Sequence, residues 1–149
     1  MKPIILDWLK TQGLTAETAL SASASNEPLL ILAARQGNSD VLAALLEEGA
    51  DLCALDFYGN NALWAACYAE SVDCINLLLA AGIDIDFQNA TGATALIYSS
   101  SCGKQAVVTL LLAEGANPFL TTLDEFSAMD LAANLQCLKL LRHATKIAG

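Results

Sequence analysis

The sequence lacks most of the residue patterns that carry chemistry. It contains one histidine, His143, six residues after Cys137, and none of its five cysteines pair in C-x-x-C spacing. Nucleophilic catalysis needs a cysteine or serine beside a base, and structural zinc needs four converging ligands. The phosphate-binding motifs G-x-G-x-x-G and G-x-x-x-x-G-K are also absent. We therefore expect no enzyme activity, no metal and no cofactor.

Basic residues are scarce. Seven lysines and arginines stand against sixteen acids, which gives a formal net charge of −9. Such a charge repels the phosphate backbone that supplies most of the affinity for nucleic acids, so we expect no nucleic-acid partner. Lys139, Arg142 and Lys146 lie near His143, where they can complement the negative end of a terminal helix.

Long apolar runs are missing too. The longest, such as "LLLAAGI" and "VVTLLLA", are far shorter than the roughly 18 residues of a membrane-spanning helix, and Asp7 interrupts the N-terminal stretch where a signal peptide would be apolar. The odd number of cysteines then favours reduced thiols, a cytoplasmic location and no membrane contact. At 55% hydrophobic and 15% charged residues, the chain should fold alone as one domain.

What the sequence does contain is a repeat of 33 residues. An interval of this length is typical of solenoids, in which each unit packs on its neighbours. Several columns of matched chemistry share the interval: Gly49, Gly82 and Gly115; Leu30, Leu63, Leu96 and Met129; Ala33, Ala66, Ser99 and Ala132; Leu45, Leu78 and Leu111; Asp51, Asp84 and Asn117.

Each period predicts two helices. Asn61, Thr94 and Ser127 can cap the short helices "ALWAACYA", "ALIYSSSC" and "AMDLAAN", whose small side chains let neighbouring helices approach closely. The second helices, "SDVLAALLEEG", "VDCINLLLAAG" and "AVVTLLLAEG", are apolar at i, i+3 and i+4 and end at a glycine suited to a left-handed cap. Between units, extended stretches with turn glycines at Gly59 and Gly92 predict hairpin-like fingers.

This pattern resembles the ankyrin repeat over roughly residues 23 to 134, with "GATALIYSSSCGKQAVVTLLLAEGAN" following the family landmarks most closely. The resemblance implies an all-α ankyrin-repeat solenoid. The landmark proline is replaced by alanine, and Glu70 stands where a turn glycine is expected. The landmark histidine, which ties adjacent fingers by hydrogen bonds in the family, is replaced by Ile31, Trp64, Ile97 and Asp130.

The two ends depart from the period. The stretch "KPIILDWLKTQG" predicts a short capping helix with Pro3 in its first turn and Ile4, Ile5, Trp8 and Leu9 on its apolar side. "LTAETALSASASN" fits a helix or a loop. The predicted division is an N-terminal cap at 1–22, repeats at 23–55, 56–88 and 89–121, and a truncated fourth repeat serving as C-terminal cap at 122–149.

The cysteines and the acidic finger residues have simple interpretations. Cys67, Cys74 and Cys137 fall on apolar columns and should be buried, whereas Cys53 and Cys102 should be accessible. Asp84 and Asp86 partly match a calcium loop, but Gln88 and Asn89 occupy later ligand and turn positions, so we expect solvated carboxylates and no calcium.

In ankyrin repeats, partners are usually gripped by the finger tips and the exposed ends of the first helices, on a concave surface. The resemblance therefore implies a non-catalytic protein-binding module, expected to be a monomer, whose aromatic residues at the fingers act as anchors. Acids at Asp56, Glu70, Asp84, Asp86, Asp124 and Glu125 favour a basic or mixed partner surface. The corresponding contact positions are Arg35, Gln36, Leu55, Phe57, Tyr58, Asn60, Tyr68, Ala69, Gln88, Ala90, Thr91, Ala93, Ser101, Cys102, Thr121, Leu123, Asp124 and Phe126.

Trp64 is expected to pack in the space of the missing histidine, while Phe57, Tyr58 and Tyr68 are expected to meet a partner. Three alternatives remain open at this point. The chain could be an inhibitor or chaperone-like regulator of one enzyme, a redox or small-molecule sensor using Cys53 and Cys102, or an effector acting on host proteins.

Overall fold

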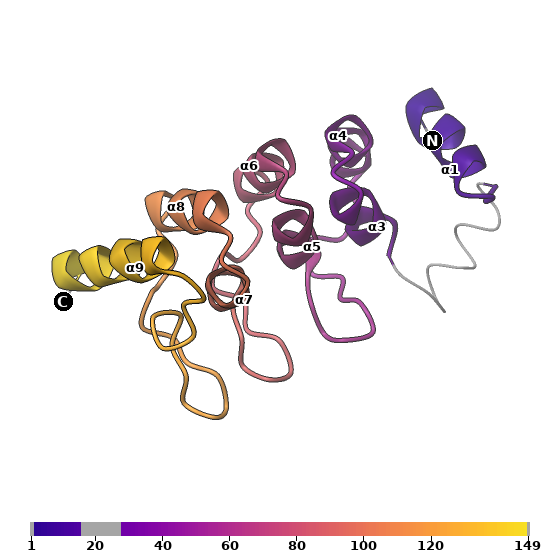
Figure 1. Cartoon of the computed structure of the whole chain (residues 1–149). Helices are drawn as coiled ribbons and strands as arrows, with labels where there is room; N and C mark the ends of the chain where they lie inside the picture. Colours follow the sequence, from indigo (N-terminus) through magenta and orange to yellow (C-terminus); the bar gives the residue numbers. More distant parts are fainter. Residues whose placement is uncertain (1, 16–27, 149) are drawn as a thin grey trace. The chain divides into compact units, whose positions relative to one another are not determined.

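The structure, a computed structural model, describes residues 2–15 and 28–148, and these ranges are helical with one isolated bridge and no strand. The chain divides into two compact units, Met1–Ile83 and Asp84–Gly149. The first contains α1 (Pro3–Thr11), α3 (Leu29–Arg35), α4 (Ser39–Glu47), α5 (Ala62–Ala69) and α6 (Val72–Ala80), and the second contains α7 (Ala95–Ser101), α8 (Gln105–Ala113) and α9 (Leu135–Ala148) (Figure 1). Most of the stretch at 14–26, predicted as helix or loop, lies outside the described residues.

Two helical pairs stack in the first unit. Helix α3 packs against α4 and α5, α5 packs against α6, and α4 packs against α6, so the first and second helices form two layers (Figure 1). Ala33 and Ala66, which occupy one column of the 33-residue repeat, are fully buried. Their methyl groups allow α3 and α5 to approach closely, which confirms the role predicted for the small residues.

The N-terminal helix covers the first pair. Helix α1 packs on α4, Ile5 and Leu9 are fully buried, and the indole Nε1 of Trp8 donates a hydrogen bond of 2.9 Å to Oε1 of Gln36. The predicted capping helix is therefore confirmed. The expectation for Ile4 is wrong, because its side chain is 41% exposed. Residues 5, 8 and 9 form the buried i, i+3, i+4 stripe, and position 4 lies about 100° away from position 5 around the helix.

The predicted caps begin a first helix at two of three positions. The side-chain oxygen of Asn61 accepts from the backbone N–H of Trp64 at 3.3 Å, and that of Thr94 accepts from Ile97 at 3.1 Å. The second helices also end as predicted, since the three column glycines that follow them have φ between 83° and 96°. The hydrogen bonds that Asn61 and Thr94 accept satisfy backbone N–H donors that each helix start leaves free.

The fourth unit departs from the prediction. The helix expected over "AMDLAAN" is wrong, since residues 128–131 form only a turn. Ser127 and Asp130 exchange hydrogen bonds as a capping pair would, and these bonds lower the pKa of Asp130, the backbone N–H of Ser127 contributing most. The side chain of Asn134 caps α9 by accepting from Cys137 N at 2.9 Å, so too few residues remain for a first helix.

Helix α9 completes the second unit by packing on α8, which in turn packs on α7. Val108, Leu111, Cys137 and Leu141 are fully buried. Among the described residues, no helix combines the length and the apolar character needed to cross a membrane.

Candidate partner-binding surface

Three finger loops repeat one backbone hydrogen-bond scheme. In each loop, one residue donates its N–H to the carbonyl four residues later and accepts from the N–H three residues later, at distances of 2.9–3.0 Å. The starting residues are 33 positions apart: Asp56, Asn89 and Thr122. The fingers predicted from the turn glycines are thus confirmed as closed, hydrogen-bonded loops.

The side chains at these starting positions organise the loops from within. Asp56 Oδ1 accepts from the N–H groups of Tyr58 and Asn60 at 2.8 and 3.0 Å. Asn89 Oδ1 accepts from the equivalent N–H groups, both at 3.0 Å, whereas the Thr122 hydroxyl accepts only from Phe126 N at 3.2 Å. This column was not predicted from the sequence, although three side chains able to accept hydrogen bonds at one interval are a readable signal.

The fingers of the second unit are also bonded to each other. The Gln88 amide donates to the carbonyl oxygens of Gly92 and Thr121 at 2.8 and 3.0 Å. Leu123 N donates to Thr91 O at 2.9 Å, and Asn117 N donates to the Asp86 carboxylate at 2.8 Å. These bonds tie adjacent fingers together although Ile97 and Asp130 stand at the positions where the resemblance implied a histidine.

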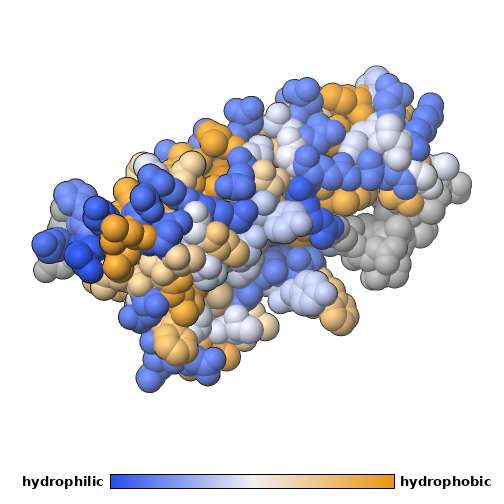
Figure 2. All heavy atoms as spheres, in the orientation of Figure 1, coloured by the Kyte–Doolittle hydropathy of each residue, from blue (hydrophilic) through white to orange (hydrophobic). Residues whose placement is uncertain are grey.

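An aromatic cluster occupies the finger of the first unit. The side chains of Phe57 and Tyr58 are 96% and 73% exposed, and their rings meet edge to face with centroids 5.6 Å apart. Tyr68, at the end of α5, is 60% exposed, and Leu55 is 43% exposed. In Figure 2 this finger extends away from α5 and shows pale and light-orange side chains. Trp64 is half-buried.

In the second unit the exposed apolar side chains are more widely spaced. Leu123 is 76% exposed and Phe126 is 47% exposed, both in the finger that precedes the Ser127 turn. Asp124 and Glu125 lie between them and are exposed, so two acidic side chains are flanked by apolar ones at this finger tip.

Most positions predicted to contact a partner are exposed, and their contact with a partner stays a prediction. Asn60 and Ala69 are half-buried. Ala93 is only 8% exposed, because this position closes its finger through hydrogen bonds to Asn89, so its methyl group offers a partner little surface. Gln36 is exposed, but its amide is engaged by Trp8 and Gln12 of the N-terminal cap.

The finger acids have structural as well as electrostatic roles. Asp84 Oδ1 accepts from Asp86 N at 3.0 Å, as Asp51 accepts from Cys53 N at 2.8 Å one repeat earlier. These carboxylates therefore have a structural role at the loop starts. Within the described residues, no group of histidines, cysteines and acids has the arrangement needed to hold a metal ion.

The cysteines lie as predicted. Cys67, Cys74 and Cys137 are fully buried, whereas Cys53 and Cys102 are exposed. Burial raises the pKa of the Cys74 thiol. The hydrogen bond with the Ser71 side chain opposes this rise, and the carboxylate of Asp73 adds to it. Burial also raises the pKa of the Cys137 thiol. A raised pKa reduces the thiolate fraction, so these buried thiols are poorly suited to nucleophilic chemistry.

Comparison with known proteins identifies the family. The family described as "Ankyrin repeats (3 copies)" matches residues 5–89 and 71–148. The chain is 37% identical over 97 residues to ankyrin repeat and SOCS box protein 3 of Homo sapiens, covering 63% of this chain and 19% of that protein. It is 33% identical over 104 residues to a putative ankyrin repeat-containing protein of Treponema pallidum (strain Nichols), covering 69% of this chain and 35% of that protein.

Comparison with a solved structure supports the same family and fold. The ankyrin repeat domain of Bcl-3, a member of the IkappaB protein family, matches with a TM-score of 0.71 and 28% identity over 76% of this chain and 50% of that chain. The chain therefore belongs to the ankyrin-repeat family and has its all-α solenoid fold. The match spans 19% and 35% of the two relatives above. Ankyrin repeats are generally protein–protein interaction modules, and the fold is typically non-catalytic.

Proposed function

We propose that this chain is a non-catalytic binding module that holds a protein partner with its finger tips and the exposed ends of its first helices. The observation that supports this most is the Phe57–Tyr58 pair, because two large rings are held in solvent on a loop that is itself fixed by hydrogen bonds. Exposed aromatic clusters of this kind mark interaction sites, since a folded chain gains nothing by leaving them in water.

The loop geometry makes these rings suitable anchors. The Asp56 carboxylate accepts from the N–H groups at both ends of the tip, so the backbone under the rings is ordered before any partner arrives. Binding then costs little conformational entropy, and rings with two rotatable bonds lose little more. Removing an anchor of this type typically costs about 2 kcal/mol or more of binding free energy.

Charge supports a basic or mixed partner surface. Sixteen acids against seven bases give a net charge of −9, and Asp124 and Glu125 are exposed at the tip of one finger. A negative surface speeds the approach of a positively charged partner, whereas the apolar rings supply the contacts that slow its release. Charge therefore guides the approach of the partner in this proposal, and the aromatic side chains retain it.

Capture of the partner from the native cell tests this proposal. We expect Phe57→Ala with Tyr58→Ala to reduce capture at least tenfold while the thermal unfolding midpoint stays close to that of the unaltered protein. The matched control is Ile4→Ala with Leu135→Ala, which removes two exposed apolar side chains outside the fingers. We expect this control to capture the partner normally.

Two outcomes would contradict the proposal. One is normal capture by the Phe57→Ala, Tyr58→Ala protein, which would show that the rings are not anchors. The other is an equal loss of capture and thermal stability, which would show that the rings support the fold instead of a partner.

A further inference from the structure

A hollow between α8 and α9 forms a second surface, and none of its lining residues belongs to the finger contacts. It has a volume of about 720 Å³, and its lining includes Leu112, Pro118, Phe119, Leu140, His143 and Ala144. Pockets of this size hold small ligands or several side chains of a peptide. We refer to it as the α8–α9 groove.

The helix packing explains why the groove is apolar. Helices α8 and α9 are in contact, and Leu111 on α8 and Leu141 on α9 are fully buried. Leu140 and Ala144, one turn apart on α9, are half-buried and line the groove beside that contact. The ring of Phe119, from the loop after α8, is 52% exposed. A large apolar ring and a leucine therefore remain partly open to solvent.

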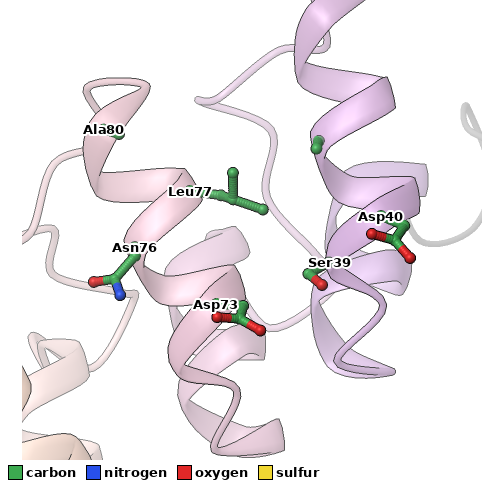
Figure 3. A pocket seen from close by; sticks show the side chains of 7 residues that line it. Ser39, Asp40, Asp73, Asn76, Leu77 and Ala80 are labelled. Carbon is green, nitrogen blue, oxygen red and sulfur yellow. The ribbon is translucent and has the colours of Figure 1, made fainter.

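The corresponding hollow in the first unit differs in chemistry. The groove between α4 and α6, about 520 Å³ in volume, carries Asp40 and Asp73 near the helix starts, with Ser39 and Asn76 beside them (Figure 3). Those acids complement the positive ends of their helices. The repeat architecture thus does not require a groove between packed helices to be bordered by bases.

Basic side chains lie on helix α9 beside the groove, which His143 of the same helix lines. The helix carries Lys139, Arg142 and Lys146 and none of the sixteen acids of the chain. Lys139, His143 and Lys146 are spaced i, i+4, i+7 and so share one stripe, and all three are exposed. Only Lys146 lies in the last turn, where the helix dipole favours a base, so the dipole does not account for Lys139. Within the described part of the chain, Lys139, His143 and Lys146 form no ion pair.

We infer that the α8–α9 groove binds a short acidic, amphipathic segment of a protein partner. Two or three apolar side chains on successive turns of that segment would occupy the groove against Phe119 and Leu140. Its carboxylates would pair with Lys139 and Lys146 along the rim. The basic stripe complements an acidic segment that is short enough to lie along α9, whereas an extended anionic membrane would also face the acids that give the chain its net charge of −9.

A pair of synthetic peptides tests the inference on the full chain. The first is a fluorescein-labelled peptide of fourteen residues with leucine or phenylalanine at i, i+4 and i+7 and glutamate elsewhere, and the second replaces every glutamate by glutamine. We expect fluorescence anisotropy to give at least tenfold tighter binding of the acidic peptide, with the difference shrinking as NaCl rises from 50 to 300 mM.

Matched variants locate the site. Lys139→Glu should weaken binding of the acidic peptide at least fivefold, and Phe119→Ala should weaken binding of both peptides. Lys10→Glu, on α1, changes the net charge equally and should alter the affinity less than twofold. Circular dichroism melting of each variant verifies the fold.

Four results would overturn the inference. Equal binding of the two peptides would remove the role of the basic stripe, and equal effects of Lys139→Glu and Lys10→Glu would move the site elsewhere. A dimer in sedimentation that Lys139→Glu dissociates would make a second copy of the chain the occupant. Co-sedimentation with phosphatidylserine vesicles, without peptide binding, would make the surface a membrane contact.

Discussion

At the residue scale, the backbone adopts a left-handed conformation at two glutamates. Glu70 has φ 54° at the position that Gly37 and Gly103 occupy in other repeats, and Glu125 has φ 69° at the position of Gly59 and Gly92. This conformation brings Cβ too close to the following carbonyl oxygen and costs a residue other than glycine about 1–2 kcal/mol. The repeat interval therefore identifies both glutamates as sites where the native backbone is strained.

Replacing one of them by glycine should stabilise the fold. We expect Glu125→Gly to raise the free energy of unfolding by about 0.5–1 kcal/mol, because relief of strain exceeds the extra freedom that glycine gives the unfolded chain. Urea denaturation measures the change. The control is Glu114→Gly, where φ is −90°, and it should be neutral or destabilising. An equal gain in both variants would contradict the strain argument.

The cysteines allow a second test at this scale. Iodoacetamide at pH 8 should alkylate Cys53 and Cys102 in the folded protein and reach Cys67, Cys74 and Cys137 only after unfolding, because burial excludes the reagent. Intact-mass spectrometry should therefore show two adducts in buffer and five in concentrated urea. Three or more adducts on protein with native circular dichroism would show that a buried thiol is accessible.

At the scale of the element, each finger depends on the side chain that starts it. Asn89 Oδ1 accepts from two backbone N–H groups and from the Thr91 hydroxyl, whereas the Thr122 hydroxyl accepts from one. Hydrogen bonds of this kind contribute about 0.5–1.5 kcal/mol each. The finger of residues 89–93 should therefore be the more sensitive of the two to loss of its starting side chain.

Asn89→Ala should accordingly lower the free energy of unfolding by about 2 kcal/mol, and Thr122→Ala by about 1 kcal/mol or less. Hydrogen exchange should also speed up at the amides of Thr91 and Ala93 in the first variant, because those N–H groups lose their acceptor. A cost for Asn89→Ala no larger than that for Thr122→Ala would show that the finger is held by its backbone bonds alone.

The elements differ in how far the sequence predicts them. Asn61 and Thr94 begin their helices as expected because a cap acts through bonds to residues three positions away. No helix follows Ser127, because Asn134 caps α9 shortly after it. A local sequence pattern does not reveal which of two neighbouring cap residues will start a helix. The bond from Gln88 to Thr121 O spans 33 residues of sequence, so spacing places both residues in fingers without showing where the amide points.

At the scale of the whole molecule, the 33-residue interval is the main source of information. It predicts the stacking of helical pairs because each unit buries its apolar face only against its neighbours. It also identifies the equivalent finger positions in successive repeats, so Phe57, Tyr58 and Leu123 were expected at the surface. All three are exposed. The interval does not encode a partner, since the solvent-facing positions vary freely between repeats.

Hydroxyl-radical footprinting of the chain with its captured partner tests the central claim most directly. In the free protein, the rings of Phe57, Tyr58 and Tyr68 should oxidise readily, and in the complex their oxidation rates should fall at least fivefold. Ile4, exposed on α1, serves as the internal reference and should keep its rate. Unchanged oxidation of all three rings in a complex that protects other residues would contradict the account.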